Sequence, residues 1–235
     1  MAQMTLFISH ISDEAELAIV FQRHILDDFL GLVDVFVSSD TESIQAGSNW
    51  LESMKSAMER AQGELILCSE ASVKRPWINF EAGAGWMKGI PIVPVCHSGY
   101  GVTDLSMPLS VLQAINANQK KGLDRLYTLI ADELGVRKPI VDFSKFIEEV
   151  KTFENTYSDF LDRQAQSQKD KENDTLKKIR ELLLKQGQSN WRDVNLVVKN
   201  GGLTRVEALT MLRKEPSIAF EIDQRGERVV KLSRI

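Results

Sequence analysis

The first 135 residues alternate between short apolar runs and longer segments with helical spacing. A short apolar run that ends in polar residues is typical of a buried strand. Such runs predict strands, with a short fifth one near the end of this region, at 4–9, 34–38, 64–69, 91–96 and 112–115. Apolar residues three and four apart predict helices between and after these strands, at 12–29, 50–62, 76–88 and 121–134.

This alternation predicts an α/β fold of the flavodoxin-like kind, with a parallel sheet and helices on both faces. Ligands of such sheets bind at the carboxyl ends of the strands. Small polar residues and histidines follow the predicted strands at these ends, namely Ser9, His10, Ser38, Ser69 and His97. We therefore expect the functional site at this edge of the sheet.

The residues after 140 follow a different pattern. The pattern of residues 144–171 predicts one long polar helix with an apolar stripe. Residues 164–174 include almost no apolar side chains, which is typical of a solvated linker. Three short helices and a hairpin with Gly226 at its bend then resemble a winged helix-turn-helix, a small α+β domain. These elements are expected at 175–186, 191–199 and 204–213 for the helices, and at 218–222 and 228–232 for the strands.

Three parts follow from these patterns. We expect an α/β domain at 1–140, a helical linker at 141–172 and a winged helix-turn-helix-like domain at 173–235. The net charge of −4 is divided unevenly, with −9 on residues 1–165 and +5 on residues 166–235. This asymmetry indicates units with different partners.

The composition is that of an ordinary globular protein, with 43% apolar and 26% charged residues in 235. No apolar run reaches the roughly 18 residues of a membrane span, and no basic segment precedes an apolar stretch at the N-terminus. Cys68 and Cys96 form neither a close pair nor a cluster with histidines, so we expect buried free thiols and no zinc site. The sequence thus predicts a cytoplasmic protein without a membrane segment.

Common nucleotide-binding motifs are absent from the sequence. No phosphate-binding loop of the form G-x-x-x-x-G-K-[ST] occurs, and Gly83 and Gly85 lie within a predicted helix instead of at a strand-to-helix turn. A phospho-receiver domain needs acidic residues where this chain has Ser9, His10 and Ser69. These observations exclude three common classes of nucleotide-binding or phosphate-accepting domain.

A carboxylate and an aromatic residue share one face of the helix predicted at 76–88. Trp77 and Glu81 are four residues apart, so both side chains point the same way, and Pro76 suits the first helical turn. Trp77 can stack on a ring or a sugar, and Glu81 can hold ribose hydroxyls and stabilise a developing oxocarbenium ion, the charge pattern of glycosidic cleavage. The plain alternative is a core tryptophan and a solvated acid.

Three segments carry a resemblance to a known family. FISHISDEAE resembles the first-strand box of TIR (Toll/interleukin-1 receptor) domains, and VFVSSDTESIQAGSNWLESMKSAMERA resembles their second strand, BB loop and following helix. ILCSEASVKRPWINFEAGAGW resembles the third strand and the helix that bears the catalytic glutamate of NAD-cleaving members. The resemblance extends from residue 4 to about residue 137.

The resemblance implies a role for individual residues. Glu81 matches the catalytic glutamate, and Ile78 stands where metazoan members have cysteine, so the chain is more similar to bacterial members. Residues 45–50 fall in the BB loop, which in the family helps to complete the site between neighbouring protomers. The substrate-binding residues implied in this way are Ser9, His10, Ser38, Gly47, Trp50, Trp77 and Phe80.

The resemblance also implies an activity, the cleavage of NAD⁺ at the nicotinamide–ribose bond to nicotinamide and ADP-ribose or a cyclic ADP-ribose isomer. NAD⁺ is then the substrate, no metal or further cofactor is expected, and homo-oligomers form through TIR–TIR contacts. Bacterial antiviral defence signalling is the implied setting. The C-terminal domain would sense a trigger or recruit a protein or nucleic-acid partner.

Other interpretations remain open. A non-catalytic TIR scaffold or adaptor acts by self-association alone, and another N-glycosidic enzyme, such as a nucleoside deoxyribosyltransferase, is possible on a similar fold. His10 is either a general base or, as we expect, a hydrogen-bonding group at the strand end; His24 is expected to be structural, and His97 is a weak candidate for the pocket. DNA binding, protein binding and a structural role are all open for the C-terminal domain, whose basic residues are Arg205, Arg213, Lys214, Arg225 and Arg228.

Overall fold

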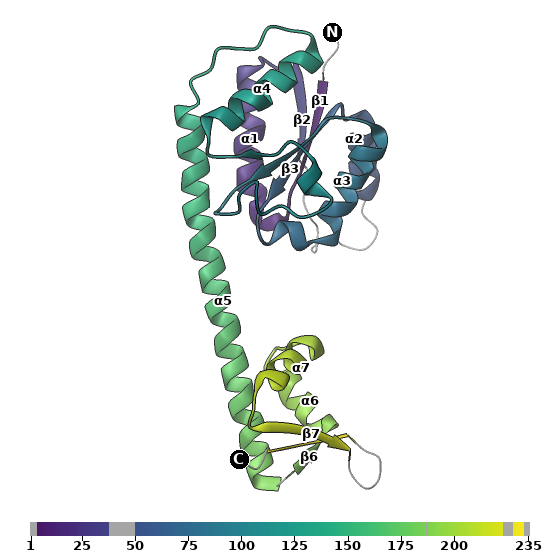
Figure 1. Cartoon of the computed structure of the whole chain (residues 1–235), viewed down its shortest axis with the longest axis vertical. Coiled ribbons are helices and arrows are strands. Elements are labelled where there is room, and N and C mark those ends of the chain that lie inside the picture. The colour runs from purple at the N-terminus through teal and green to yellow at the C-terminus, as the bar shows by residue number, and fades with distance from the viewer. Residues whose placement is uncertain (1–3, 38–49, 187, 223–227, 233–235) are drawn as a thin grey trace. The chain divides into compact units, whose positions relative to one another are not determined.

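The computed structural model describes residues 4–37, 50–186, 188–222 and 228–232. The chain consists of two compact units, Met1–Ser158 and Asp159–Ile235. The division falls inside one long helix, α5 (Ser144–Gln186), which Figure 1 shows with the other elements. The domain boundaries expected at 140 and 172 stay predictions.

A parallel sheet forms the centre of the first unit. Among the described residues it has five strands in the order β2-β1-β3-β4-β5, and each neighbouring pair is parallel. β1 and β3 are buried along their whole length, as expected for a parallel sheet covered by helices on both faces. The strands are β1 (Met4–Ser9), β2 (Val33–Val37), β3 (Gly63–Cys68), β4 (Ile92–Cys96) and β5 (Ile115–Asn116).

Helices cover both faces of this sheet (Figure 1). α2 and α3 lie on one face, and α1, α4 and the start of α5 lie on the other. The predicted flavodoxin-like α/β class is therefore confirmed. The helices are α1 (Ala15–Asp28), α2 (Trp50–Arg60), α3 (Pro76–Lys88) and α4 (Lys120–Leu134), with short 3₁₀ turns at Ser12–Glu14, Ser72–Lys74 and Leu109–Val111.

The fifth strand and the long helix α5 differ from the sequence prediction. The fifth strand, expected at 112–115, comprises only Ile115–Asn116. The helices expected at 144–171 and 175–186 are one continuous helix, α5, because no glycine or proline interrupts this stretch of sequence. The segment 164–174, expected as a solvated linker, is largely exposed but helical.

The first four turns of α5 belong to the core of the first unit. Phe146 is buried, with its ring stacked on the His24 imidazole at 4.2 Å and edge-on to Phe21 at 4.9 Å. His24 Nε2 also lies 2.8 Å from a carboxylate oxygen of Glu149. His24 therefore has the structural role expected for it, because its contacts with Phe146 and Glu149 pack α5 against α1.

The second unit contains three helical segments and a small antiparallel sheet. Its described strands have the order β6-β8-β7, and β6, a polar strand, was not predicted. Thr204 caps α7 in a capping box with Glu207, as its spacing predicts. Besides the end of α5, the elements are β6 (Gln188–Asn190), α6 (Trp191–Asn200), α7 (Arg205–Lys214), β7 (Ile218–Ile222) and β8 (Arg228–Leu232).

The two cysteines are neighbours in the sheet. Cys68 and Cys96 face each other across β3 and β4 as free, buried thiols. Burial raises the pKa of Cys68 well above its usual value and that of Cys96 to about 12, so both thiols stay protonated at neutral pH. Across the described residues, no helix has both the length and the apolar character of a membrane span.

Candidate active site

Glu81 lies where the first turns of α3 pass the carboxyl end of β1. Pro76 begins the helix, and four residues after Trp77 the carboxyl group of Glu81 turns toward the sheet, where it is 1% exposed. The Ser9 hydroxyl, at the last position of β1, donates a hydrogen bond of 2.5 Å to Glu81 Oε2. The Trp77 indole Nε1 donates one of 2.9 Å to Glu81 Oε1.

These two bonds fix the orientation of the carboxyl group. One donor comes from the sheet and one from the helix that carries Glu81. Rotation of the carboxyl group would therefore break at least one of the two hydrogen bonds. A carboxylate has about four lone-pair sites, so one oxygen can accept more than one hydrogen bond. The result is a buried acceptor, held at the sheet edge where flavodoxin-like folds bind ligands.

An aromatic surface lies beside this carboxyl group. The Trp77 ring is half-buried and stacks on Phe80, with ring centroids 5.1 Å apart. Phe80 itself is 60% exposed. A flat ring or a sugar that approached Glu81 would therefore meet an exposed aromatic face next to it.

The other residues implied by the resemblance have different surroundings. His10 is fully buried, and its Nδ1 lies 2.6 Å from the carbonyl oxygen of Ile11, in keeping with a hydrogen-bonding role at the strand end. Ser38 and Gly47 lie outside the described residues. Trp50 begins α2, and its side chain also lies outside the described part.

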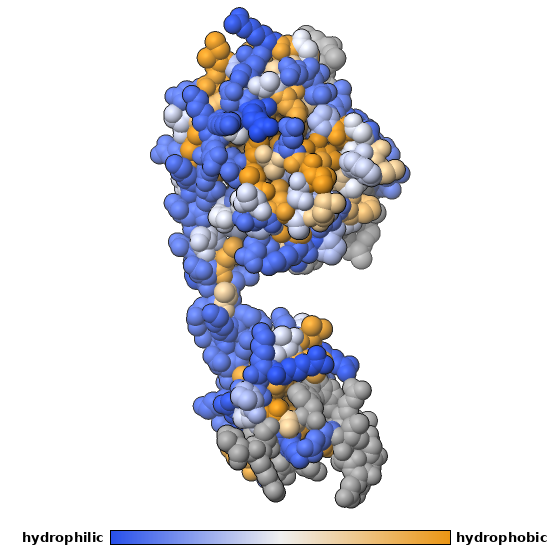
Figure 2. Space-filling view, viewed as in Figure 1, coloured by the Kyte–Doolittle hydropathy of each residue, from blue (hydrophilic) through white to orange (hydrophobic). Residues whose placement is uncertain are grey.

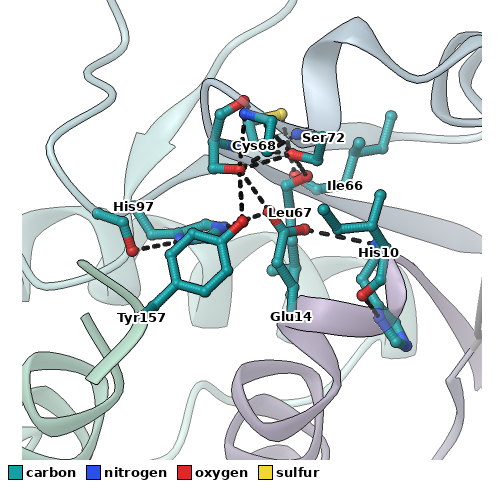
Figure 3. Close-up of polar contacts among 12 residues, drawn as sticks. His10, Glu14, Ile66, Leu67, Cys68, Ser72, His97 and Tyr157 are labelled. Carbon is teal, nitrogen blue, oxygen red and sulfur yellow. Dashed lines mark hydrogen bonds and ion pairs between the residues drawn. The ribbon is translucent and has the colours of Figure 1, made fainter. Parts of the chain in front are cut away.

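A second buried polar cluster occupies the same sheet edge beneath α5 (Figure 3). The sequence placed Ser69 and His97 at this edge but did not predict that Glu14 and Tyr157 join them. The Ser69 hydroxyl, after β3, donates to Glu14 Oε1 at 2.6 Å, and His97 Nε2 lies 3.3 Å from the same oxygen. The Tyr157 hydroxyl of α5 lies 3.4 Å from Ser69 Oγ. All four side chains are buried, and burial raises the pKa of Tyr157 to about 12, so its hydroxyl stays protonated.

α5 contacts this edge at a second point. Glu154 accepts hydrogen bonds from the Ser98 backbone N–H at 2.9 Å and from Asn118 Nδ2 at 2.8 Å. His97 lies edge-on to the Phe153 ring, so it packs beneath α5 and does not line an open pocket. The loops after β3, β4 and β5 are therefore all held by the same helix.

The fold and this edge define a flavodoxin-like α/β protein in which a buried carboxyl group, Glu81, is bonded to both sheet and helix. The sequence model of the TIR domain matches residues 6–129, which is more than half of the chain. The chain therefore belongs to the TIR domain family. A comparison with curated proteins finds no match.

The matched segment runs from β1 into α4 and includes Ser9, Trp77 and Glu81. TIR domains include NAD-cleaving enzymes and signalling scaffolds, and they associate with one another. The family match ends before α5 and the second unit.

Proposed function

We propose that this protein is an NAD⁺ nucleosidase that cleaves the nicotinamide–ribose bond. The products are nicotinamide and either ADP-ribose or a cyclic ADP-ribose isomer. The observation that carries the proposal is the position of Glu81, which is buried, bonded to Ser9 and Trp77 and next to an exposed aromatic face. Such a carboxyl group supports the stabilisation of a ribosyl cation beside a flat base.

The chemistry of NAD⁺ suits a site built around one carboxylate. When the C1′–N bond breaks, its electron pair goes to the pyridinium nitrogen, so nicotinamide leaves as a neutral molecule without protonation. The positive charge appears on the ribose instead, as an oxocarbenium ion. A carboxylate fixed in a buried site stabilises that charge far more strongly than a solvated one, because the local dielectric is low.

The second step needs only a nucleophile at C1′. Attack by water, followed by loss of a proton, gives ADP-ribose. Attack by a ring nitrogen of the adenine in the same molecule closes a cyclic isomer. In our proposal Trp77 and Phe80 stack on a ring of the substrate, and which nucleophile succeeds depends on how the adenine is held.

Neighbouring copies complete the site in this proposal. His10 and Ser38 would be among its substrate-binding residues, and residues 45–50 with Gly47 and Trp50 would complete it between protomers, as the resemblance implies. Large apolar side chains exposed on α3 support assembly, since an isolated monomer gains nothing from exposing them. They are Phe80, Trp86 and Met87, which are 60–79% exposed, and the orange areas of Figure 2 show the apolar surface of this unit in one view.

We further propose that the second unit, which resembles a winged helix, binds the trigger or a partner. Arg205, Arg213 and Lys214 are exposed on α7, which favours an acidic partner, either a protein or a nucleic acid. Glu207 and Glu215 lie among them, and Glu215 pairs with Arg180 at 2.8 Å. This partial neutralisation favours a protein over DNA. Bacterial antiviral signalling in the cytoplasm is the proposed setting.

The full chain at high concentration, with a crowding agent to promote assembly, tests the proposed reaction. We expect nicotinamide to appear as NAD⁺ disappears, and chromatography of the other product separates hydrolase from cyclase. Parallel incubations with deoxynucleosides should release no free base. Release of base with NAD⁺ untouched would identify a deoxyribosyltransferase, and the absence of both reactions in assembled protein would favour a scaffold.

Ser9→Ala should lower the rate of nicotinamide release by about tenfold, because it removes one of the two bonds that orient Glu81. The measurement is kcat/KM together with the melting temperature of the variant. Ser110→Ala is the matched control, since Ser110 is exposed and distant in sequence from Glu81. Equal rates for the two variants would show that the Ser9 bond does not orient a catalytic group.

A further inference from the structure

A second carboxyl group is buried on the same face of the sheet as Glu81. Glu64 is the second residue of β3 and is 1% exposed. Among the residues that the structure describes, neither of its carboxyl oxygens has a hydrogen-bond partner. A buried, unpartnered charge is very costly, so the position calls for a neutral acid and for a reason to keep it there.

Glu64 lies directly under α3. A Cβ atom added to Gly85 would be 2.0 Å from Glu64 Oε2 and 3.2 Å from its carboxyl carbon. The Glu64 carboxyl group therefore occupies the space that a side chain at position 85 would need, and glycine leaves that space open. The other glycine of this helix differs, because a Cβ at Gly83 would have no neighbour within 4 Å.

The two contacts between sheet and helix have the same spacing. Ser9 is level with Ile66 and Phe7 with Glu64, so Ser9 lies two residues above Glu64, or about 6.6 Å along the strands. Glu81 and Gly85 are four residues apart on α3, or about 6 Å along its axis. Ser9–Glu81 and Glu64–Gly85 thus form two matched contacts that fix the height of α3 on the sheet.

The surroundings of Glu64 keep it protonated. Burial, and then repulsion by Glu81, raise its pKa to about 9. Glu81 on α3 is the charged group that acts on it among the described residues, and its neighbours in the sheet, Phe7 and Ile92, are apolar. At neutral pH the Glu64 carboxyl group is therefore neutral.

We propose that Glu64 is a positioning residue for Glu81. As a neutral acid Glu64 fills the space under Gly85, and when Glu64 ionises it displaces α3. The proposal rests on the proposed NAD⁺ cleavage for its effect on activity. It makes the enzyme sensitive to alkaline pH through a group that does not touch the substrate.

The first test compares two alanine substitutions in the same helix. Gly85→Ala should lower kcat for nicotinamide release by about tenfold and lower the melting temperature, because the buried Glu64 carboxyl group has no route to solvent. Gly83→Ala should lower neither kcat nor the melting temperature, since its Cβ meets open space. In a Glu64→Ala background, Gly85→Ala should have no further adverse effect. Equal effects of Gly85→Ala in both backgrounds would overturn the proposal.

The second test follows pH in the wild type and in Glu64→Gln. The folded protein holds a proton on Glu64 that the unfolded chain releases above a pKa near 4.5, so the melting temperature should fall by about 3 °C per unit between about pH 5 and pH 9. Glu64→Gln should lack this component. Wild-type kcat should drop about fourfold between roughly pH 7 and pH 9.5 at unchanged KM, and Glu64→Gln should lack that drop.

A readout that needs no activity separates this proposal from the proposed function. The Trp77 indole N–H resonance reports its bond to Glu81, and in wild type it should shift with a midpoint near the pKa of about 9. No such shift should occur in Glu64→Gln. Identical titrations of the two proteins would overturn the proposal, whether or not the wild type cleaves NAD⁺. Distinct titrations in a protein that leaves NAD⁺ intact would support it and reject the proposed function instead.

Discussion

A fragment that ends at residue 140 is expected to be unfolded, whereas one that ends at residue 165 is expected to fold. The difference is the segment 141–165, which contains Phe143 and the first half of α5 and supplies large buried side chains to the core of the first unit. Burying five such side chains contributes roughly 10 kcal/mol, which is comparable to the whole stability of a domain, about 5–15 kcal/mol. They are Phe143, Phe146, Val150, Phe153 and Tyr157.

Polar contacts add to this loss. Without α5, Ser98 and Asn118 lose the Glu154 acceptor, and the cluster of Glu14 and Ser69 is opened to water. Circular dichroism and thermal melts of the two fragments beside the full chain test the prediction. Phe146→Ala in the full chain should cost about 3–5 kcal/mol, and Lys145→Ala, at an exposed position, is its control. A cooperative melt of the 1–140 fragment at the temperature of the 1–165 fragment would contradict this account.

Glu81→Gln is expected to lower the turnover of NAD⁺ by roughly 10³-fold or more, with the fold intact. Glutamine keeps the shape of the side chain. Its carbonyl can accept from Trp77, which is only a donor, while its amide can donate to the Ser9 hydroxyl, so both contacts survive. What is lost is the negative charge that opposes the oxocarbenium ion.

Three measurements together test this second prediction. The melting temperature of Glu81→Gln should stay close to that of wild type, and its affinity for NAD⁺ should change little, because the charge acts mainly in the transition state. The loss should therefore appear in kcat and not in KM. A large drop in melting temperature would instead mean that Glu81 is a structural residue.

Most of the first unit could be predicted because its local and tertiary signals agree. The strands of a covered parallel sheet are short apolar runs, and the helices between them repeat at helical spacing. β5 and β6 were harder because β5 has only two residues and β6 is short and polar. The continuity of α5 did have a local signal, namely the absence of glycine and proline from 144 to 186.

The site could be predicted only in part. The pair of Trp77 and Glu81 follows from helical spacing, and the donor at Ser9 from its place at a strand end. The cluster beneath α5 could not be found in this way. Glu14 has the pattern of an acid in the first turn of a helix, and Tyr157 that of one member of an apolar stripe, and only packing brings them together.

The same limit applies to Glu64. In the sequence it is an acid at the start of an apolar run, where a solvated side chain is usual. Its burial depends on Gly85, which is 21 residues later and on another element. A helix interior disfavours glycine by about 1 kcal/mol, so the two glycines of α3 were a signal of close packing, but not of its partner.

The release of nicotinamide from NAD⁺ by assembled full-length protein tests the central claim most directly. Wild type, Glu81→Gln and Glu70→Gln are compared at high protein concentration; Glu70 is an exposed acid paired with Lys74 near the start of α3. Wild type and Glu70→Gln should release nicotinamide as NAD⁺ is lost, and Glu81→Gln should not. Release by Glu81→Gln within about twofold of the wild-type rate, or none by wild type in any assembled state, would contradict the claim.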